Sequence, residues 1–261
     1  MKYSIVTCVY GNPKQFKNSL LAAMNQKCNF KYEVIVIDNG TPDSGIFDAC
    51  YNFTVPDGKS LGYMRIDPAE KKTFNTTHGT NMGAQAAIGE NIVVLADPNV
   101  LLSYNFLSEV DNLMNYGIIV TSSNCDIKLS PKGTKASEYE DIEGKEDINS
   151  QFLALLGWPK DPMEFNLDLV PHRYPPPHQN HDVYVFAMNR ELFLKDGGYD
   201  ESETGWGLYH TNLVKKFCHQ YTWIKLTNVR VVHQYHGLNY GKEMKPGKYS
   251  KQFEIMRCRR T

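Results

Sequence analysis

The first 121 residues alternate between short apolar runs and stretches with helical spacing. The runs are rich in β-branched residues and end at turn residues, which predicts strands. They lie at residues 2–10, 32–37, 92–95 and 117–121. The helical stretches lie at residues 16–24, 78–90 and 106–114. Strands that are apolar on both faces and joined by helices predict an α/β fold with a mostly parallel central sheet.

The second half of the chain has a weaker pattern. Residues 122–180 are polar, charged and proline-bearing, so we expect long loops there, with one short helix near 152–156. A strand is expected at 183–188, followed by a short helix, a helix near 208–217 and a strand near 222–232. The final stretch is basic and glycine-bearing, which is typical of a mobile arm.

Composition excludes several classes of protein. With 261 residues, 41% of them hydrophobic, the chain can bury a sizeable core, which argues against global disorder. A net charge of −1 argues against a general nucleic-acid binder. The charge is uneven, however, since residues 210–261 carry 11 Lys and Arg against 2 Asp and Glu. This basic end fits contact with phosphate or an anionic surface, and it equally fits a solvated basic face.

Targeting signals are weak in this sequence. Its six cysteines include no CxxC pair, which indicates reduced thiols and a cytoplasmic location. The N-terminal apolar run is short, has no cleavage pattern and predicts a strand rather than a signal peptide. Because no run approaches the ~20 apolar residues of a membrane span, we expect no transmembrane segment.

Polar residues follow three of the predicted strands at the point where each strand ends. They are Tyr10 and Gly11, Asp38 and Asn39, and Asp97 and Asn99. In parallel sheets, ligands bind at the carboxyl ends of the strands. The three polar ends therefore predict one binding site at that edge of the sheet.

Four stretches in order carry a resemblance to a known family. They read SIVTCVYGNP, EVIVIDNGTPD, NMGAQAAIGENIVVLADPNV and VFAMNRELFLKDGGYDESETGWG. Over roughly residues 3–120 and 183–236, this order and spacing resemble family 2 of the glycosyltransferases. The resemblance implies a GT-A fold, a Rossmann-like α/β sandwich with an acceptor-side extension. It also implies a nucleoside-diphosphate sugar as donor and a glycan or other hydroxyl acceptor.

The resemblance assigns the donor site to the first two strand ends. Thr7, Val9 and Tyr10 would line the pocket for the nucleotide base, and Asp38 and Asn39 would meet the base or the ribose. Asp38 also has a structural interpretation, because Asp-Asn-Gly forms a tight turn by itself. The two roles can coexist at one side chain.

The third strand end matches the family's metal motif, which usually holds two acids separated by one residue. Here Asp97 is the first acid and Asn99, a weaker neutral ligand, stands in place of the second. We expect Mn²⁺ or Mg²⁺ at Asp97 and Asn99, with Asp97 contacting the ribose as the alternative. Of the two histidines in the motif HQYH, His236 is favoured as a further metal or diphosphate contact. Lys242, in the basic arm, would contact the donor diphosphate.

The acceptor side departs most from the family, which usually has a Glu-Asp pair after Gly-Trp-Gly. His210 stands where the family has the aspartate that acts as the catalytic base. A neutral imidazole can also accept a proton from the acceptor hydroxyl. Glu201 and Glu203 are alternative bases, and a protein without a base is a third possibility. Asp200 and Trp206 would bind the acceptor, with Trp206 offering an apolar face to a sugar ring or packing in the core.

The sequence as a whole predicts a single GT-A domain over residues 1–261. Residues 1–121 would form the nucleotide-sugar half, 122–236 the acceptor half and 237–261 a basic C-terminal arm. The predicted activity is glycosyl transfer, assisted by a divalent cation. A non-catalytic nucleotide-sugar or glycan binder is the alternative. A nucleotidyltransferase is disfavoured, because no glycine-rich phosphate loop follows the first strand.

Overall fold

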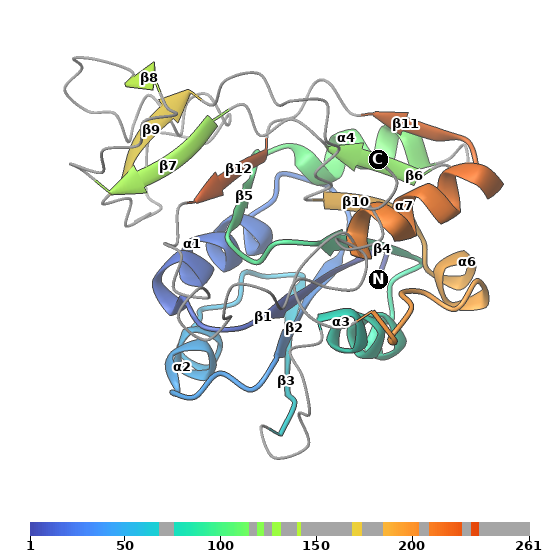
Figure 1. Ribbon diagram of the computed structural model, residues 1–261. Coiled ribbons are helices and arrows are strands. Elements are labelled where there is room, and N and C mark those ends of the chain that lie inside the picture. Colours follow the sequence, from blue (N-terminus) through green and yellow to red (C-terminus); the bar gives the residue numbers. More distant parts are fainter. Residues whose placement is uncertain are drawn as a thin grey trace, which may run out of the picture.

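The computed structural model describes residues 1–67, 76–114, 119–122, 127–131, 140–141, 169–173, 185–203, 209–225 and 231–234. Within this part of the chain, a seven-stranded central sheet lies beside a smaller five-stranded sheet (Figure 1). Helices cover both faces of the central sheet. Among the described residues, no helix combines the length and apolarity needed to cross a membrane.

The central sheet is mostly parallel, as the sequence predicts. Its strands are β1 (Tyr3–Val9), β2 (Tyr32–Asp38), β3 (Lys59–Arg65), β4 (Asn91–Leu95), β6 (Ile119–Ser122), β10 (Val185–Asn189) and β11 (Trp223–Lys225). Their order across the sheet is β11-β6-β10-β4-β1-β2-β3. Strands β1 to β4 run parallel to one another, and β11 runs parallel to β6. Only β10 is antiparallel to both of its neighbours among the strands described in this sheet.

Two hydrophobic cores hold the helices on the sheet. One core joins one face to α1 (Pro13–Met24), α2 (Gly45–Tyr51) and α4 (Phe106–Met114). The other joins the opposite face to α3 (Thr76–Ala86), α6 (Arg190–Lys195) and α7 (Tyr209–Gln220). Strand β1 supplies both cores by alternation, with Ile5 in the first and Val6 and Cys8 in the second. A strand that is buried on both faces has a mostly apolar sequence, which is why β1 could be predicted.

The second sheet corrects the expectation of loops over residues 122–180. Its strands are β5 (Val100–Leu102), β7 (Ile127–Pro131), β8 (Glu140–Asp141), β9 (Leu169–Arg173) and β12 (Val231–Gln234), in the order β5-β12-β7-β9-β8. Three of these strands fall in the region predicted to be loops. They are short, and two contain proline, so their sequences lack a strand pattern.

Other boundaries also differ from the sequence prediction. The single strand expected near 222–232 is two strands, β11 and β12, which belong to different sheets. The elements α2, β3 and β5 were not predicted. The short helix expected near 152–156 and the basic arm at 237–261 lie outside the described residues.

Candidate functional site

The carboxyl ends of β1, β2 and β4 lie at one edge of the sheet, because the three strands are parallel neighbours. Val9 pairs with Asp38 at the last position of β1 and β2. Beyond it, the Asn39 N–H donates to the Val9 carbonyl at 2.7 Å and the Gly11 N–H donates to Thr41 Oγ1 at 3.1 Å. Gly11 has a φ of 66°, a left-handed value that favours glycine. The structure thus ties the first two polar strand ends together.

Asp38 is fully buried at the centre of this edge. Its carboxylate accepts hydrogen bonds from the Thr41 N–H at 2.8 Å and the Tyr63 hydroxyl at 2.9 Å. The Arg65 guanidinium lies 3.9 Å from the same carboxylate and donates to the Thr41 carbonyl at 2.7 Å. Burial and the bond to Asp38 raise the pKa of Tyr63. Asp38 therefore stabilises the turn after β2. The contact of Asp38 and the buried Asn39 with a nucleotide stays a prediction.

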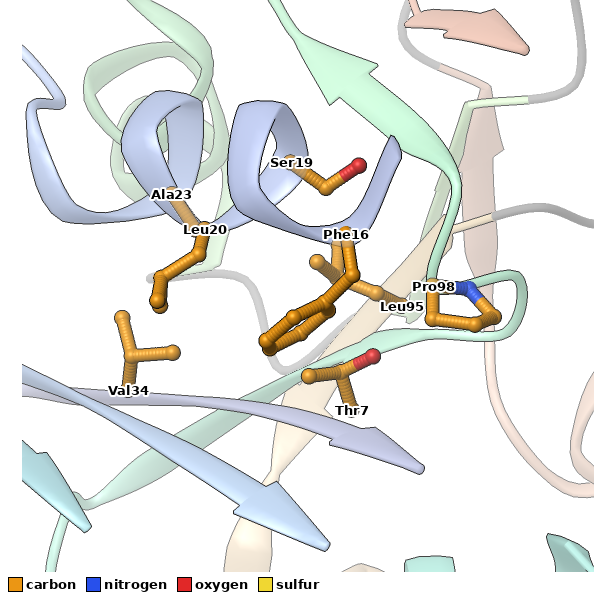
Figure 2. Close-up of a pocket in the computed structure, with 8 residues that line it drawn as sticks. All are labelled: Thr7, Phe16, Ser19, Leu20, Ala23, Val34, Leu95 and Pro98. Atoms are coloured by element: carbon orange, nitrogen blue, oxygen red, sulfur yellow. The ribbon is translucent and has the colours of Figure 1, made fainter. Parts of the chain in front are cut away.

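The side chains predicted to line the base pocket are mostly turned into the core. Thr7 and Val9 are buried, and Tyr10 is half-buried. The Thr7 Oγ1 has no hydrogen-bond partner in the described part of the chain. It faces a seam between α1 and the sheet that has no room for a water molecule (Figure 2). The seam is lined by Thr7, Phe16, Ser19, Leu20, Ala23, Val34, Leu95 and Pro98.

The chain turns tightly after β4, at Asp97-Pro98-Asn99. The Asn99 backbone N–H and side-chain Nδ2 both donate to Asp97 Oδ1, at 2.8 and 3.0 Å. The Asn99 carbonyl accepts from the backbone N–H and the Nε2 of Gln234, at 3.0 and 3.1 Å. Gln234 is fully buried, and its Oε1 accepts from Asn18 Nδ2 at 2.9 Å. A buried polar network therefore anchors this turn to α1 and β12.

The Asp97 turn could offer two oxygen ligands to a divalent cation, provided that the Asn99 amide turns over. Asn99 is 2% exposed, and its Oδ1 has no hydrogen-bond partner among the described residues. A half-turn of the amide would place Oδ1 where Nδ2 lies, 3.0 Å from Asp97 Oδ1. Two oxygens at about that separation suit neighbouring ligands of an ion with bonds near 2.1 Å. No cluster of three His, Cys, Asp or Glu ligands occurs in the described ranges. Magnesium is commonly held by one or two protein ligands together with substrate phosphates, and Asp97 with Asn99 would suit that arrangement.

His210 lies at the start of α7, close to the Asp97 turn. Its Nδ1 is 2.6 Å from the Tyr199 hydroxyl, and its Nε2 is buried with the Ala96 carbonyl nearby but without a hydrogen bond of regular geometry in the described ranges. Burial lowers the pKa of His210 to about 3, although the charge of Asp97 and the carbonyl of Ala96 act in the opposite direction. The ring is therefore neutral near pH 7, as a base must be, but Nε2 is shielded from solvent. Its catalytic role stays a prediction.

The loop after α6 is tied to two helices. Asn81 of α3 donates to the Tyr199 carbonyl and accepts from the Tyr199 N–H, both at 2.9 Å. The same Nδ2 donates to Glu201 Oε1 at 2.9 Å. Asn212 of α7 donates to Glu203 Oε1 at 3.0 Å. These bonds fix the two carboxylates that the sequence proposed as alternative bases.

Glu201 also contacts a residue that sequence reasoning missed. His78, in the first turn of α3, lies with its Nδ1 2.8 Å from Glu201 Oε2. Burial raises the pKa of Glu201, but hydrogen bonds from Asn81 and His78 outweigh it and leave that pKa below its usual value. No local spacing signals this pair, because its members are 123 residues apart.

The remaining predicted site residues are placed as follows. Asp200 is exposed, and its carboxylate accepts from the N–H and hydroxyl of Ser202, which lower the pKa of Asp200. Trp206, His236 and Lys242 lie outside the described residues.

No protein-family model and no curated protein matches this sequence, whereas its structure is similar to solved glycosyltransferases. S. aureus TarS 1–349 in complex with UDP-GlcNAc matches with a TM-score of 0.62 at 14% identity, over 99% of this chain and 65% of that one. Mannosyltransferase PcManGT from Pyrobaculum calidifontis, in complex with GDP-Man and Mn²⁺, gives 0.54 at 15% identity, over 90% and 56%. GalNAc-T7 with UDP, GalNAc and Mn²⁺ gives 0.55 at 16% identity, over 90% and 44%.

These similarities establish the fold. The predicted GT-A-type α/β architecture with a mostly parallel central sheet is confirmed. The chain covers 65% or less of the length of each of these structures. Identities of 14–16% carry the architecture and not the substrate.

Proposed function

We propose that the protein is a glycosyltransferase of family 2 that transfers a sugar from a nucleoside-diphosphate donor to a glycan or other hydroxyl acceptor. The observation that carries this proposal is the meeting of three polar strand ends at one edge of a GT-A sheet. In open α/β sheets, that edge is where ligands bind. Support comes from neighbours of this fold whose structures hold UDP-GlcNAc or GDP-Man.

The donor would lie across the ends of β1, β2 and β4. Tyr10, Asp38 and Asn39 would contact the nucleoside, with Thr7 and Val9 shaping the strand end beneath it. Because Asp38 is fully buried, with Thr41 and Tyr63 bonded to its two oxygens, its contact with a nucleotide would require a neighbouring group to move. Asp97 and Lys242 would face the diphosphate.

Asp97 and Asn99 would hold a Mn²⁺ or Mg²⁺ ion together with the donor phosphates, and His236 would assist. The ion would neutralise charge on the departing nucleoside diphosphate. Support comes from the closeness of the Asn99 amide to Asp97 Oδ1, at 3.0 Å, and from the Mn²⁺ in two structures of this fold.

The acceptor would bind on the side of the loop that follows α6. Asp200 and Trp206 would contact it, and His210, Glu201 or Glu203 would accept its proton. We propose a single domain, with residues 1–121 as the donor half, 122–236 as the acceptor half and 237–261 as a basic arm. We also propose a cytoplasmic location, which is supported by the lack of a CxxC pair and by Cys8, Cys28 and Cys50, which form no disulfide.

A non-catalytic nucleotide-sugar or glycan binder is the second candidate. It is favoured by the neutral side chains of Asn99 and His210, which stand where the family usually keeps acids. A glycosyltransferase and a nucleotide-sugar binder both require donor binding, and turnover separates them, whereas a glycan binder requires no donor.

Calorimetry with UDP and GDP, in the presence of Mn²⁺ or Mg²⁺, tests the shared premise. We expect binding in the millimolar-to-micromolar range, about 4–8 kcal/mol. Asp97→Ala should abolish it, whereas Asp57→Ala, a change at an exposed turn residue, should leave it intact. Absence of binding by the unaltered protein would refute the glycosyltransferase and the nucleotide-sugar binder, and would leave only a glycan binder. Binding without release of nucleoside diphosphate would favour the second candidate.

A further inference from the structure

His78 and Glu201 form a hydrogen-bonded pair that joins α3 to the loop before α7. The imidazole Nδ1 lies 2.8 Å from Glu201 Oε2, and the other carboxylate oxygen accepts from Asn81 at 2.9 Å. Both oxygens of Glu201 are therefore engaged, and the carboxylate has a fixed orientation. A carboxylate held in this way accepts the Nδ1–H of a neutral imidazole and leaves Nε2 with the lone pair.

The packing of α3 places this pair at the ligand-binding edge. A Cβ added to Gly79 would lie 2.5 Å from Cys8 Sγ and 3.3 Å from the Ile37 side chain. Cys8 and Ile37 are the next-to-last residues of β1 and β2, so the start of α3 lies over the carboxyl ends of those strands. His78 precedes Gly79 directly. It thus stands at the same edge of the sheet as Asp38.

Exposure separates this pair from Asp38 and from the ring of His210. The side chains of His78 and Glu201 are 46% and 45% exposed. Asp38 is fully buried, and the Nε2 of His210 is also buried. A group that removes a proton from a substrate hydroxyl must be reachable by that hydroxyl. His78 meets this requirement, and Glu201 orients its ring through the hydrogen bond to Nδ1.

We propose that His78 is the general base of the transfer reaction and that Glu201 is its positioning residue. This inference rests on the proposed glycosyltransferase function and moves the proton acceptor from His210 to His78. It also gives a role to Glu201, which the sequence suggested as an alternative base. Glu201 acts through the imidazole rather than on the acceptor.

The proton balance of the step is simple. The acceptor hydroxyl loses its proton to His78 Nε2 as its oxygen forms a bond to the anomeric carbon of the donor sugar. The bond from that carbon to the diphosphate oxygen breaks, and the nucleoside diphosphate leaves with the electron pair. Glu201 stabilises the imidazolium that forms, and the imidazolium then returns its proton to solvent.

Four proteins test the inference: the unaltered chain, His78→Ala, Glu201→Gln and the control His219→Ala, which alters an exposed histidine at the far end of α7. UDP-GlcNAc and GDP-mannose serve as donors with Mn²⁺, and water and a panel of simple sugars serve as acceptors. Release of UDP or GDP gives kcat and KM. Calorimetry with UDP and GDP reports donor binding separately, and thermal unfolding reports whether each variant is folded.

We expect His78→Ala to lower kcat by ~10²–10⁴-fold, with little change in donor KM. Added imidazole should restore part of the rate of His78→Ala, because it replaces the missing base. It should not restore Glu201→Gln, which keeps its histidine and loses a smaller share of kcat. His219→Ala should match the unaltered protein.

The outcomes divide cleanly. Turnover of His78→Ala within about threefold of the unaltered chain, or a loss that imidazole does not rescue, overturns the inference while leaving the glycosyltransferase proposal intact. Nucleotide binding without turnover by the unaltered chain also overturns it, because a base then has nothing to deprotonate. Absence of nucleotide binding refutes the proposed function itself.

Discussion

Replacing His210 with glutamine should change how stability depends on pH. The ordinary pKa of histidine is 6.5, and burial lowers that of His210 to about 3. Between those values the unfolded chain binds a proton at His210 that the folded chain does not. Stability contributed by the neutral ring is therefore fully present above about pH 6.5 and is lost as the pH falls toward about 3. Glutamine carries no titrating group, so the variant lacks this loss.

The size of the effect follows from the shift. One pH unit of differential protonation corresponds to about 1.4 kcal/mol, so the unaltered protein should lose about 3 kcal/mol between pH 6.5 and pH 4 through this residue. Near neutral pH the variant should itself be less stable by about 1–3 kcal/mol, because it loses the hydrogen bond to Tyr199. The gap between the two proteins should therefore close on acidification and vanish or invert near about pH 5.

Urea unfolding from about pH 4 to pH 8, with a chelator present, measures the free energy of unfolding of both proteins. His219→Gln is the matched control, because that histidine is exposed. We expect the control to parallel the unaltered protein at every pH. If the difference between the unaltered protein and His210→Gln stays constant across the range, the low pKa of His210 is wrong, and with it the enclosed position of its ring.

Three further predictions concern the site and its support. Asn99→Asp should lower Tm in the presence of a chelator, because a second carboxylate would face Asp97. Mn²⁺ should restore the Tm of this variant. If the Tm does not change when Mn²⁺ is added, position 99 is not a metal ligand. Gly79→Ala should cost about 1–3 kcal/mol of unfolding free energy, since its Cβ would press on Cys8; unchanged urea midpoints would contradict this packing. Tyr63→Phe should cost about 1–3 kcal/mol by removing a hydrogen bond to a buried carboxylate, and full stability by the same measurement would show that the bond is not needed.

The central sheet was predictable wherever a strand is buried on both faces. Strands β1 and β2 are buried at every position, so most of their residues are apolar. Strand β3 lies at the edge of the sheet, and none of its positions is fully buried. Its sequence, KSLGYMR, mixes polar and apolar residues because the edge imposes no strict pattern. It therefore escaped prediction although it pairs with β2 along its whole length.

Prediction of the site from the sequence has the same limit, because local features can be predicted and remote contacts cannot. The turn at Asp38 and the sharp stop at Asp97 are local features, and the sequence displays both. The partners that give these acids their environment are remote: the Tyr63 hydroxyl comes from an edge strand 25 residues later, and Gln234 comes from the second sheet. His78 and Glu201 meet because Gly79 and Gly83 let α3 lie close to the sheet. No local sequence pattern indicates this contact.

The two departures from the family pattern have a common physical basis in this structure. Asn99 is 2% exposed, and a carboxylate in its place would be buried beside Asp97 with an oxygen that lacks a partner. His210 has a buried Nε2, and a carboxylate there would likewise be buried near the negative charge of Asp97. Burying an unpaired charge costs several kcal/mol, so neutral side chains suit both positions in the absence of a cation. The hydrogen-bonded pair His78 and Glu201 lies instead at the exposed rim, where solvent and Asn81 stabilise the Glu201 carboxylate. The arrangement concentrates neutral groups around Asp97 and leaves the exchange of protons to the rim.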